Sequence, residues 1–198
     1  MKAADTFSLS MLEKGIIKEE DIPIYRYGIE NGIILIFNML TAFVIGILTG
    51  RLVEILVFLL SYITLRSYSG GFHLDNKIAC YISSNLILMI PACASEMGYA
   101  FVRTWNEPVK VIEIAFVICS AVIIFSLSPM DSKQRKLDTA EKKHFKFRAR
   151  LILMVQLVVV GILCFIGQRI CVVPICISIC TIAVLMLIGK IQLAAQLA

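Results

Sequence analysis

Apolar residues in this chain are grouped in long blocks, and charged or glycine-containing stretches separate the blocks. A helix needs about 20 apolar residues to cross a bilayer. The pattern therefore predicts an all-α, polytopic membrane protein with about six transmembrane helices in one membrane-embedded domain. The expected spans are residues 31–50, 52–65, 78–102, 109–128, 151–167 and 170–188 of the 198.

The segment ahead of the first span has a different pattern. Between residues 6 and 20, apolar residues recur at roughly helical spacing among charged ones, which is typical of an amphipathic helix at the membrane interface. We therefore assign residues 1–22 to an interfacial helix. Pro23 fits the first turn of the helix that follows, and residues 23–128 hold the first four spans with their connections.

The second span is short for its task. Residues 52–65 cover about 21 Å at the helical rise, against a hydrocarbon core of about 30 Å. The segment crosses only if its flanks contribute, if it tilts or if protein partly buries it, and Glu54 near one end adds to the cost. In the third span, Pro91 predicts a kink.

Composition supports a membrane protein. Hydrophobic residues make up 59% of the chain and charged residues 17%, which is too little polar material to cover a soluble globule of this size. The net charge is +5, but Lys and Arg gather beside apolar runs, so anionic lipid headgroups are the expected partner and nucleic acid is not. The acidic start of the chain argues against a cleavable signal peptide.

Basic residues predict the orientation. With six spans, the two termini, the loop 66–77 and the linker 129–150 share one side of the membrane. Cytoplasmic loops collect Lys and Arg, so we expect this side to be cytoplasmic. The basic run 142–150 is either an anchor on anionic lipid or a means of gathering an acidic peptide. The opposite side holds only Arg51, Arg103, Lys110 and Arg169.

The loop after the second span carries an unusual set of side chains: Arg66, Gly70, Gly71, His73 and, at the start of the third span, Cys80. Attack on an amide needs a thiolate and a proton donor for the leaving amine, and a Cys/His pair supplies both near neutral pH. In one continuous helix, His73 and Cys80 would lie about 10 Å apart along the axis. The loop must therefore fold back to unite them.

Local sequence favours this reversal. The Gly-Gly pair permits positive φ, and Asp75 or Asn76 can cap a helix that begins near Lys77. Cys80 then lies in the opening turns of the third span, where a helix N-terminus and a protonated His73 favour the thiolate. Asp75 and Asn76 are also candidates for orienting the imidazole of His73.

Each of these residues also has an ordinary explanation. Arg66 can hold carboxylate or carbonyl groups of a substrate, or it can anchor the cytoplasmic end of the second span. His73 can be an interfacial polar residue, Cys80 a packing residue, and Gly-Gly only a turn signal. The other six cysteines lie in apolar runs without CxxC spacing and are interpreted as small buried hydrophobes. With only two histidines in the chain, we expect no metal and no cofactor.

The six blocks, the amphipathic start, the basic linker and the motif resemble the AgrB family, the accessory gene regulator B proteins of Gram-positive bacteria. These are membrane endopeptidases that process peptides. The resemblance implies that Cys80 is the nucleophile and His73 its base. It also implies that Arg66, Gly70 and Gly71 support the site or position the substrate.

The resemblance further implies a cysteine peptidase of the bacterial plasma membrane with a cytoplasmic active site. Its substrate would be an amphipathic propeptide of the AgrD type, cut before an acidic C-terminal tail. The retained part would close into a thiolactone or lactone autoinducer for quorum sensing, and the enzyme would be a homodimer. The alternative is a non-catalytic small transporter or assembly subunit, suggested by Glu54 and the kinked third span.

Overall fold

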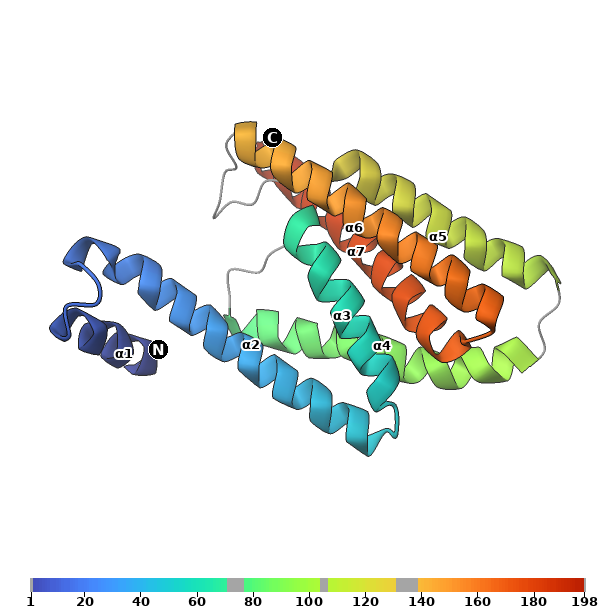
Figure 1. Ribbon diagram of the computed structural model, residues 1–198, viewed down its shortest axis with the longest axis horizontal. Helices are drawn as coiled ribbons and strands as arrows, with labels where there is room; N and C mark the ends of the chain where they lie inside the picture. Colours follow the sequence, from blue (N-terminus) through green and yellow to red (C-terminus); the bar gives the residue numbers. More distant parts are fainter. Residues whose placement is uncertain (1, 71–76, 104–106, 131–138, 198) are drawn as a thin grey trace.

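The computed structural model describes residues 2–70, 77–103, 107–130 and 139–197. Within these ranges every regular element is helical, so the predicted all-α class is confirmed (Figure 1). The helices are α1 (Lys2–Glu13), α2 (Ile22–Leu48), α3 (Leu52–Ser69), α4 (Lys77–Arg103), α5 (Glu107–Leu127), α6 (Thr139–Ile166) and α7 (Arg169–Leu197), with the 3-10 turn η1 (Glu19–Asp21) before α2.

Four of the described helical segments are long and apolar enough to cross a membrane: Glu19–Leu48, Leu52–Ser69, Glu141–Ile166 and Ile170–Ala194. Two further apolar stretches, in α4 and α5, are shorter as described. The chain is therefore a membrane protein with several apolar helices, and the count of six spans stays a prediction.

The N-terminal helix is shorter than its periodicity predicts, because a glycine ends it. α1 stops at Glu13, and Gly15 follows with φ +67°. The amide of Gly15 donates to the carbonyl of Leu12 at 2.9 Å and the amide of Ile16 to that of Met11 at 3.0 Å, which is the hydrogen-bond pair of a glycine-terminated helix. The same pair of bonds recurs at Gly50 and at Gly167, where it closes the short α2–α3 and α6–α7 turns.

Two helices extend beyond the predicted spans. α3 continues to Ser69, so the flank of the second span contributes the length that residues 52–65 lack. α6 begins at Thr139, inside the segment predicted as a linker, because residues 139–150 contain no proline or glycine and are rich in Ala, Lys, Arg and Glu. The basic run 142–150 therefore forms the first turns of α6.

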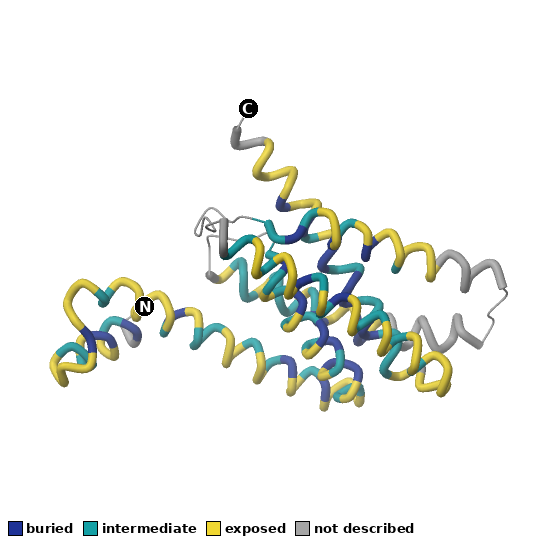
Figure 2. Tube along the Cα trace, turned by 45° about the horizontal axis from the view of Figure 1, so that its top comes forward, coloured by how far each residue is buried: buried dark blue, intermediate teal, exposed yellow. Residues whose placement is uncertain are grey.

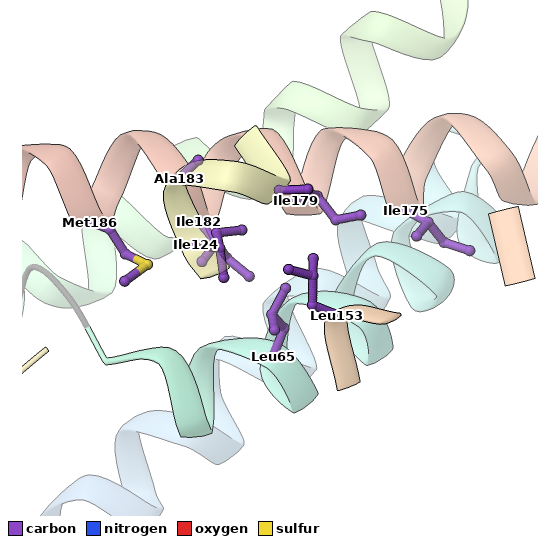
Figure 3. Packing of buried hydrophobic residues seen from close by; sticks show 9 residues of the cluster. Leu65, Ile124, Leu153, Ile175, Ile179, Ile182, Ala183 and Met186 are labelled. Carbon is purple, nitrogen blue, oxygen red and sulfur yellow. The ribbon is translucent and has the colours of Figure 1, made fainter. Parts of the chain in front are cut away.

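The helices α3, α5, α6 and α7 meet in the larger of two apolar cores. α7 packs along both α3 and α5. Figure 3 shows Leu65 of α3, Ile124 of α5 and Leu153 of α6 converging on Ile179 and its neighbours on α7. A second core joins α2, α3 and α4 through Ala42, Ile55, Phe58, Leu88 and Ala92.

The N-terminal part of the chain projects from this bundle. Figures 1 and 2 show α1 and the first half of α2 extending away from the other helices, while the second half of α2 reaches α3 and α4. α1 lies along α2, with Ala4 and Ser8 buried between them. The guanidinium of Arg26 on α2 pairs with the carboxylate of Asp5 at 2.9 Å.

The outer faces of the helices are apolar, as a lipid-facing surface requires. Large aliphatic and aromatic side chains are exposed along α2, α4, α5 and α6. The interpretation of the cysteines as buried needs correction here, because Cys93, Cys119 and Cys164 are exposed. A small thiol is tolerated on such a face, since its surroundings are as apolar as a core.

Polar side chains link α3, α6 and α7 inside the bundle. The hydroxyls of Ser61 and Ser178 are hydrogen-bonded across the α3–α7 contact. The amide of Gln156 on α6 donates to the carbonyl of Ser61 at 2.9 Å. Such bonds stabilise helix pairs in lipid by about 0.6 kcal/mol on average and up to about 1.7 kcal/mol.

Gln156→Leu is expected to lower the stability of the bundle by about 1 kcal/mol, because Ser61 loses its interhelical donor. Thermal unfolding of the purified protein in detergent measures the effect as a lower Tm. Gln192→Leu, at an exposed position on α7, is the matched control and should change Tm little. Equal shifts for the two variants would contradict a structural role for Gln156.

Candidate active site at the ends of α3 and α4

The C-terminal end of α3 is closed by its own arginine. Arg66, in the last turn, donates a hydrogen bond to the carbonyl of Gly70. Gly70 has φ +72° and ψ −153°, a backbone region that is essentially restricted to glycine. The positive φ predicted for Gly70 is confirmed, while the reversal itself falls on residues outside the described ranges.

A distant segment packs against Ser69 and Gly70 at the end of α3. The amide of Met130, which follows α5, donates to the carbonyl of Ser69 at 3.0 Å. A Cβ on Gly70 would lie 2.5 Å from the carbonyl oxygen of Met130. Gly70 is therefore required twice, once for its backbone conformation and once for the close approach of Met130.

The basic start of α6 lies at the same end of the bundle. The rings of Tyr68 on α3 and Phe145 on α6 are in contact, with centroids 5.7 Å apart. Phe145 belongs to the basic run 142–150. Several Lys and Arg residues are thereby brought near the end of α3, an arrangement that the sequence pattern alone did not predict.

Cys80 lies in the first turns of α4, as its distance from Lys77 predicts. Its thiol is free and half-buried. The side chains of Tyr62 and Arg66 on α3 lie close enough to Cys80 to interact with it electrostatically. The structure therefore brings together two of the predicted site residues, Arg66 and Cys80, from different helices.

The guanidinium of Arg66 lies within electrostatic range of the Cys80 thiol. The bond to Gly70 holds the guanidinium in place, so that its charge stays at the end of α3. Sequence reasoning assigned Arg66 to the substrate or to anchoring, and it did not foresee the proximity to Cys80.

Sequence reasoning also missed Tyr62. Its position four residues before Arg66 places the two side chains on one face of a helix. That signal became visible only once α3 was known to continue through Arg66. Tyr62 stacks on Phe58, with ring centroids 5.5 Å apart, so the apolar core extends to the site.

Gly71 and His73 lie outside the described residues, as do Asp75 and Asn76. The pairing of His73 with Cys80 therefore stays a prediction. In the part of the chain that the structure describes, no group of three or more His, Cys, Asp or Glu side chains is placed to hold a metal ion.

Comparison with known proteins places these residues in a family context. The family model for accessory gene regulator B, AgrB, matches residues 4–191. An AgrB-like protein of Clostridium perfringens strain SM101 is 28% identical over 61% of this chain and 56% of its own length. A second, from strain 13, is 26% identical over the same shares.

A third AgrB-like protein, from Halalkalibacterium halodurans, is 25% identical over 73% of this chain and 68% of its own length. The chain thus aligns with little more than half of each Clostridium relative. No solved structure matches it. Since the family model extends over nearly all of the sequence, this chain belongs to the AgrB family.

Proposed function

We propose that this protein is a membrane-embedded cysteine endopeptidase that removes the C-terminal tail of an AgrD-type propeptide and promotes cyclisation of the remainder. The product would be a thiolactone or lactone autoinducer. The observation that carries the proposal is that Cys80 on α4 lies within electrostatic range of Arg66 on α3. Membership of the AgrB family supports the choice of substrate.

In the first step the imidazole of His73 takes the proton of Cys80, and the sulfur attacks the scissile carbonyl. The C–N bond breaks, and the imidazolium donates its proton to the amine of the leaving tail. A thioester between Cys80 and the peptide remains. Arg66 holds a carbonyl or carboxylate group of the substrate, and Gly71 leaves room for the substrate backbone.

In the second step a cysteine or hydroxyl of the bound peptide attacks this thioester. A new thioester or ester closes the ring, the sulfur of Cys80 leaves, and the proton of the attacking thiol or hydroxyl passes through His73 to that sulfur. Exchange of one thioester for another conserves the bond type and is therefore close to thermoneutral. A half-buried site at the membrane favours this exchange over hydrolysis, because it limits water and holds the peptide's own nucleophile nearby.

The location of the site suits an amphipathic substrate. A peptide helix lying on the inner leaflet searches in two dimensions and meets a site at the same depth. The basic turns of α6, joined to the end of α3 by the Tyr68–Phe145 contact, attract an acidic tail and anionic headgroups. This proposal includes a cytoplasmic site and termini in a bacterial plasma membrane, and a homodimeric assembly.

The alternative of a small transporter was suggested by Glu54 and by the kinked third span, and Glu54 has a simpler explanation. Glu54 was its candidate for an ion path, and its carboxylate is buried in the first turn of α3. There it pairs with Arg51 at 3.5 Å. An ion pair between the N-terminal turn of a helix and the residue before it is explained by local stabilisation of that turn.

Co-expression with a candidate propeptide tests the proposal directly. If the propeptide's internal cysteine is replaced by alanine, the second step is blocked and the thioester should accumulate. Mass spectrometry of the intact protein should then show an adduct equal to the peptide without its tail, lost on treatment with hydroxylamine. Cys119→Ala, at an exposed cysteine of α5, should form the same adduct. Tail release without any Cys80 adduct would contradict the mechanism.

A further inference from the structure

The helix that carries Cys80 is joined to α2 by a row of polar side chains. The hydroxyl of Tyr81 on α4 lies 2.7 Å from the Thr41 hydroxyl on α2. One turn further along, the amide nitrogen of Asn85 lies 3.4 Å from the amide oxygen of Asn38 on α2. These four residues, which we call the α2–α4 polar seam, were not singled out by the sequence pattern.

The direction of the Tyr81–Thr41 bond follows from counting hydrogens. The hydroxyl of Thr41 also lies 2.9 Å from the carbonyl of Phe37, to which it donates its only hydrogen. Thr41 must therefore accept from Tyr81. The hydroxyl of Tyr81 therefore donates its hydrogen to Thr41 on α2. Asn85 also donates to the backbone carbonyl of Tyr81 at 2.9 Å, within α4.

Apolar packing does little to orient this part of α4. Among its described side chains, the buried apolar ones are Leu88, Pro91 and Ala92, all two or more turns beyond Cys80. Ile78 and Ile82, on either side of Cys80, are 71% and 52% exposed. The first turns of α4 are therefore held to the bundle largely by polar contacts.

We propose that Tyr81 and Thr41 are positioning residues that set the rotation of α4 and thereby aim Cys80 at Arg66. The inference rests on the proposed peptidase function. Neighbouring residues on a helix point about 100° apart, so a Tyr81 side chain fixed to α2 directs Cys80 toward another neighbour, α3. A rotation of α4 by about 20° would move an atom about 5 Å from the axis by about 2 Å. Misplacement by about 1 Å can slow a reaction about a hundredfold.

Tyr81→Phe and Thr41→Val each remove one partner of this bond. Both are expected to lower kcat for tail release at least about tenfold and to change KM less than about twofold, since a positioning residue acts through Cys80 and not on substrate binding. The assay uses purified enzyme in liposomes with a propeptide that the wild-type protein processes. The double variant should be no slower than the slower single variant, because both changes break the same bond.

Thr41→Ser keeps the hydroxyl and should restore the wild-type kcat. Tyr25→Phe, at an exposed tyrosine of α2, and Thr181→Val, at a threonine of α7 whose hydroxyl bonds within its own helix, are the matched controls. The rate at which a maleimide alkylates Cys80, followed by peptide mapping, should change in the seam variants and not in the controls. If Tyr81→Phe fails to insert, the pair Thr41→Val and Thr41→Ser decides the question.

A wild-type kcat in Thr41→Val, or a raised KM at unchanged kcat, would overturn the positioning role. The proposed function fails by a different result, namely processing by a variant that lacks the Cys80 thiol. An inactive Cys80 variant beside fully active seam variants would therefore reject this inference alone.

Discussion

Cys80→Ala is expected to reduce tail release by on the order of a thousandfold or more, because alanine has no atom that can form the acyl intermediate. The side chain is half-buried near the N-terminal end of α4 and is no part of either apolar core. Insertion and folding should therefore be retained. Isolated membranes incubated with the propeptide, with the released tail followed by mass spectrometry, give the rate.

Two further variants sharpen this test. Cys80→Ser keeps the shape but supplies a much weaker nucleophile, and it should also be inactive. Cys119→Ala removes a thiol from the exposed face of α5 and should process the peptide at the wild-type rate. If Cys80→Ala released the tail as fast as the unchanged protein, thiol catalysis would be excluded.

Gly70→Ala is expected to damage the site almost as severely. The backbone conformation of Gly70 would cost any other residue about 1 to 3 kcal/mol in folding free energy. The added Cβ would also lie 2.5 Å from the carbonyl oxygen of Met130, so the segment after α5 must move. Because Arg66 is bonded to the carbonyl of Gly70, the guanidinium should move with it. We expect tail release to fall more than tenfold and Tm to fall as well.

Gly50→Ala is the matched control for this variant. Gly50 ends the turn at the opposite end of α3 with φ +65°, and a Cβ there would meet nothing within 4 Å. Alanine at this position should cost about 1 kcal/mol of backbone strain and lower Tm, while activity is retained. A Gly70→Ala protein that lost stability but kept full activity would show that the conformation of Gly70 does not shape the site.

Much of the fold was predictable because lipid imposes a simple rule on sequence. A long apolar block forms a helix, so α2 and α7 follow from composition, and Pro23 correctly predicted where α2 begins. Helix ends were less predictable. The basic run of α6 has good helix formers but a polar composition, so it was assigned to a linker, although hydrogen bonds along the backbone continue through it.

The site was predictable in its local parts and not in its long-range ones. The need for glycine at position 70 and the place of Cys80 near a helix start follow from neighbouring residues. The packing of Met130 on Gly70 and the bond between Tyr81 and Thr41 join segments far apart in the chain. Such pairs depend on how helices are arranged in three dimensions, and no periodicity in one sequence encodes them visibly.

The brief turn at Gly167 bears on how the protein is made. α6 and α7 are joined by a connection so short that its backbone bonds run from Gly167 and Gln168 directly back into α6. The connection between α6 and α7 therefore contains no long hydrophilic loop that the insertion machinery would have to move across the bilayer. We therefore expect the two helices to enter the bilayer together, with the basic start of α6 on the cytoplasmic side that the charge rule predicts.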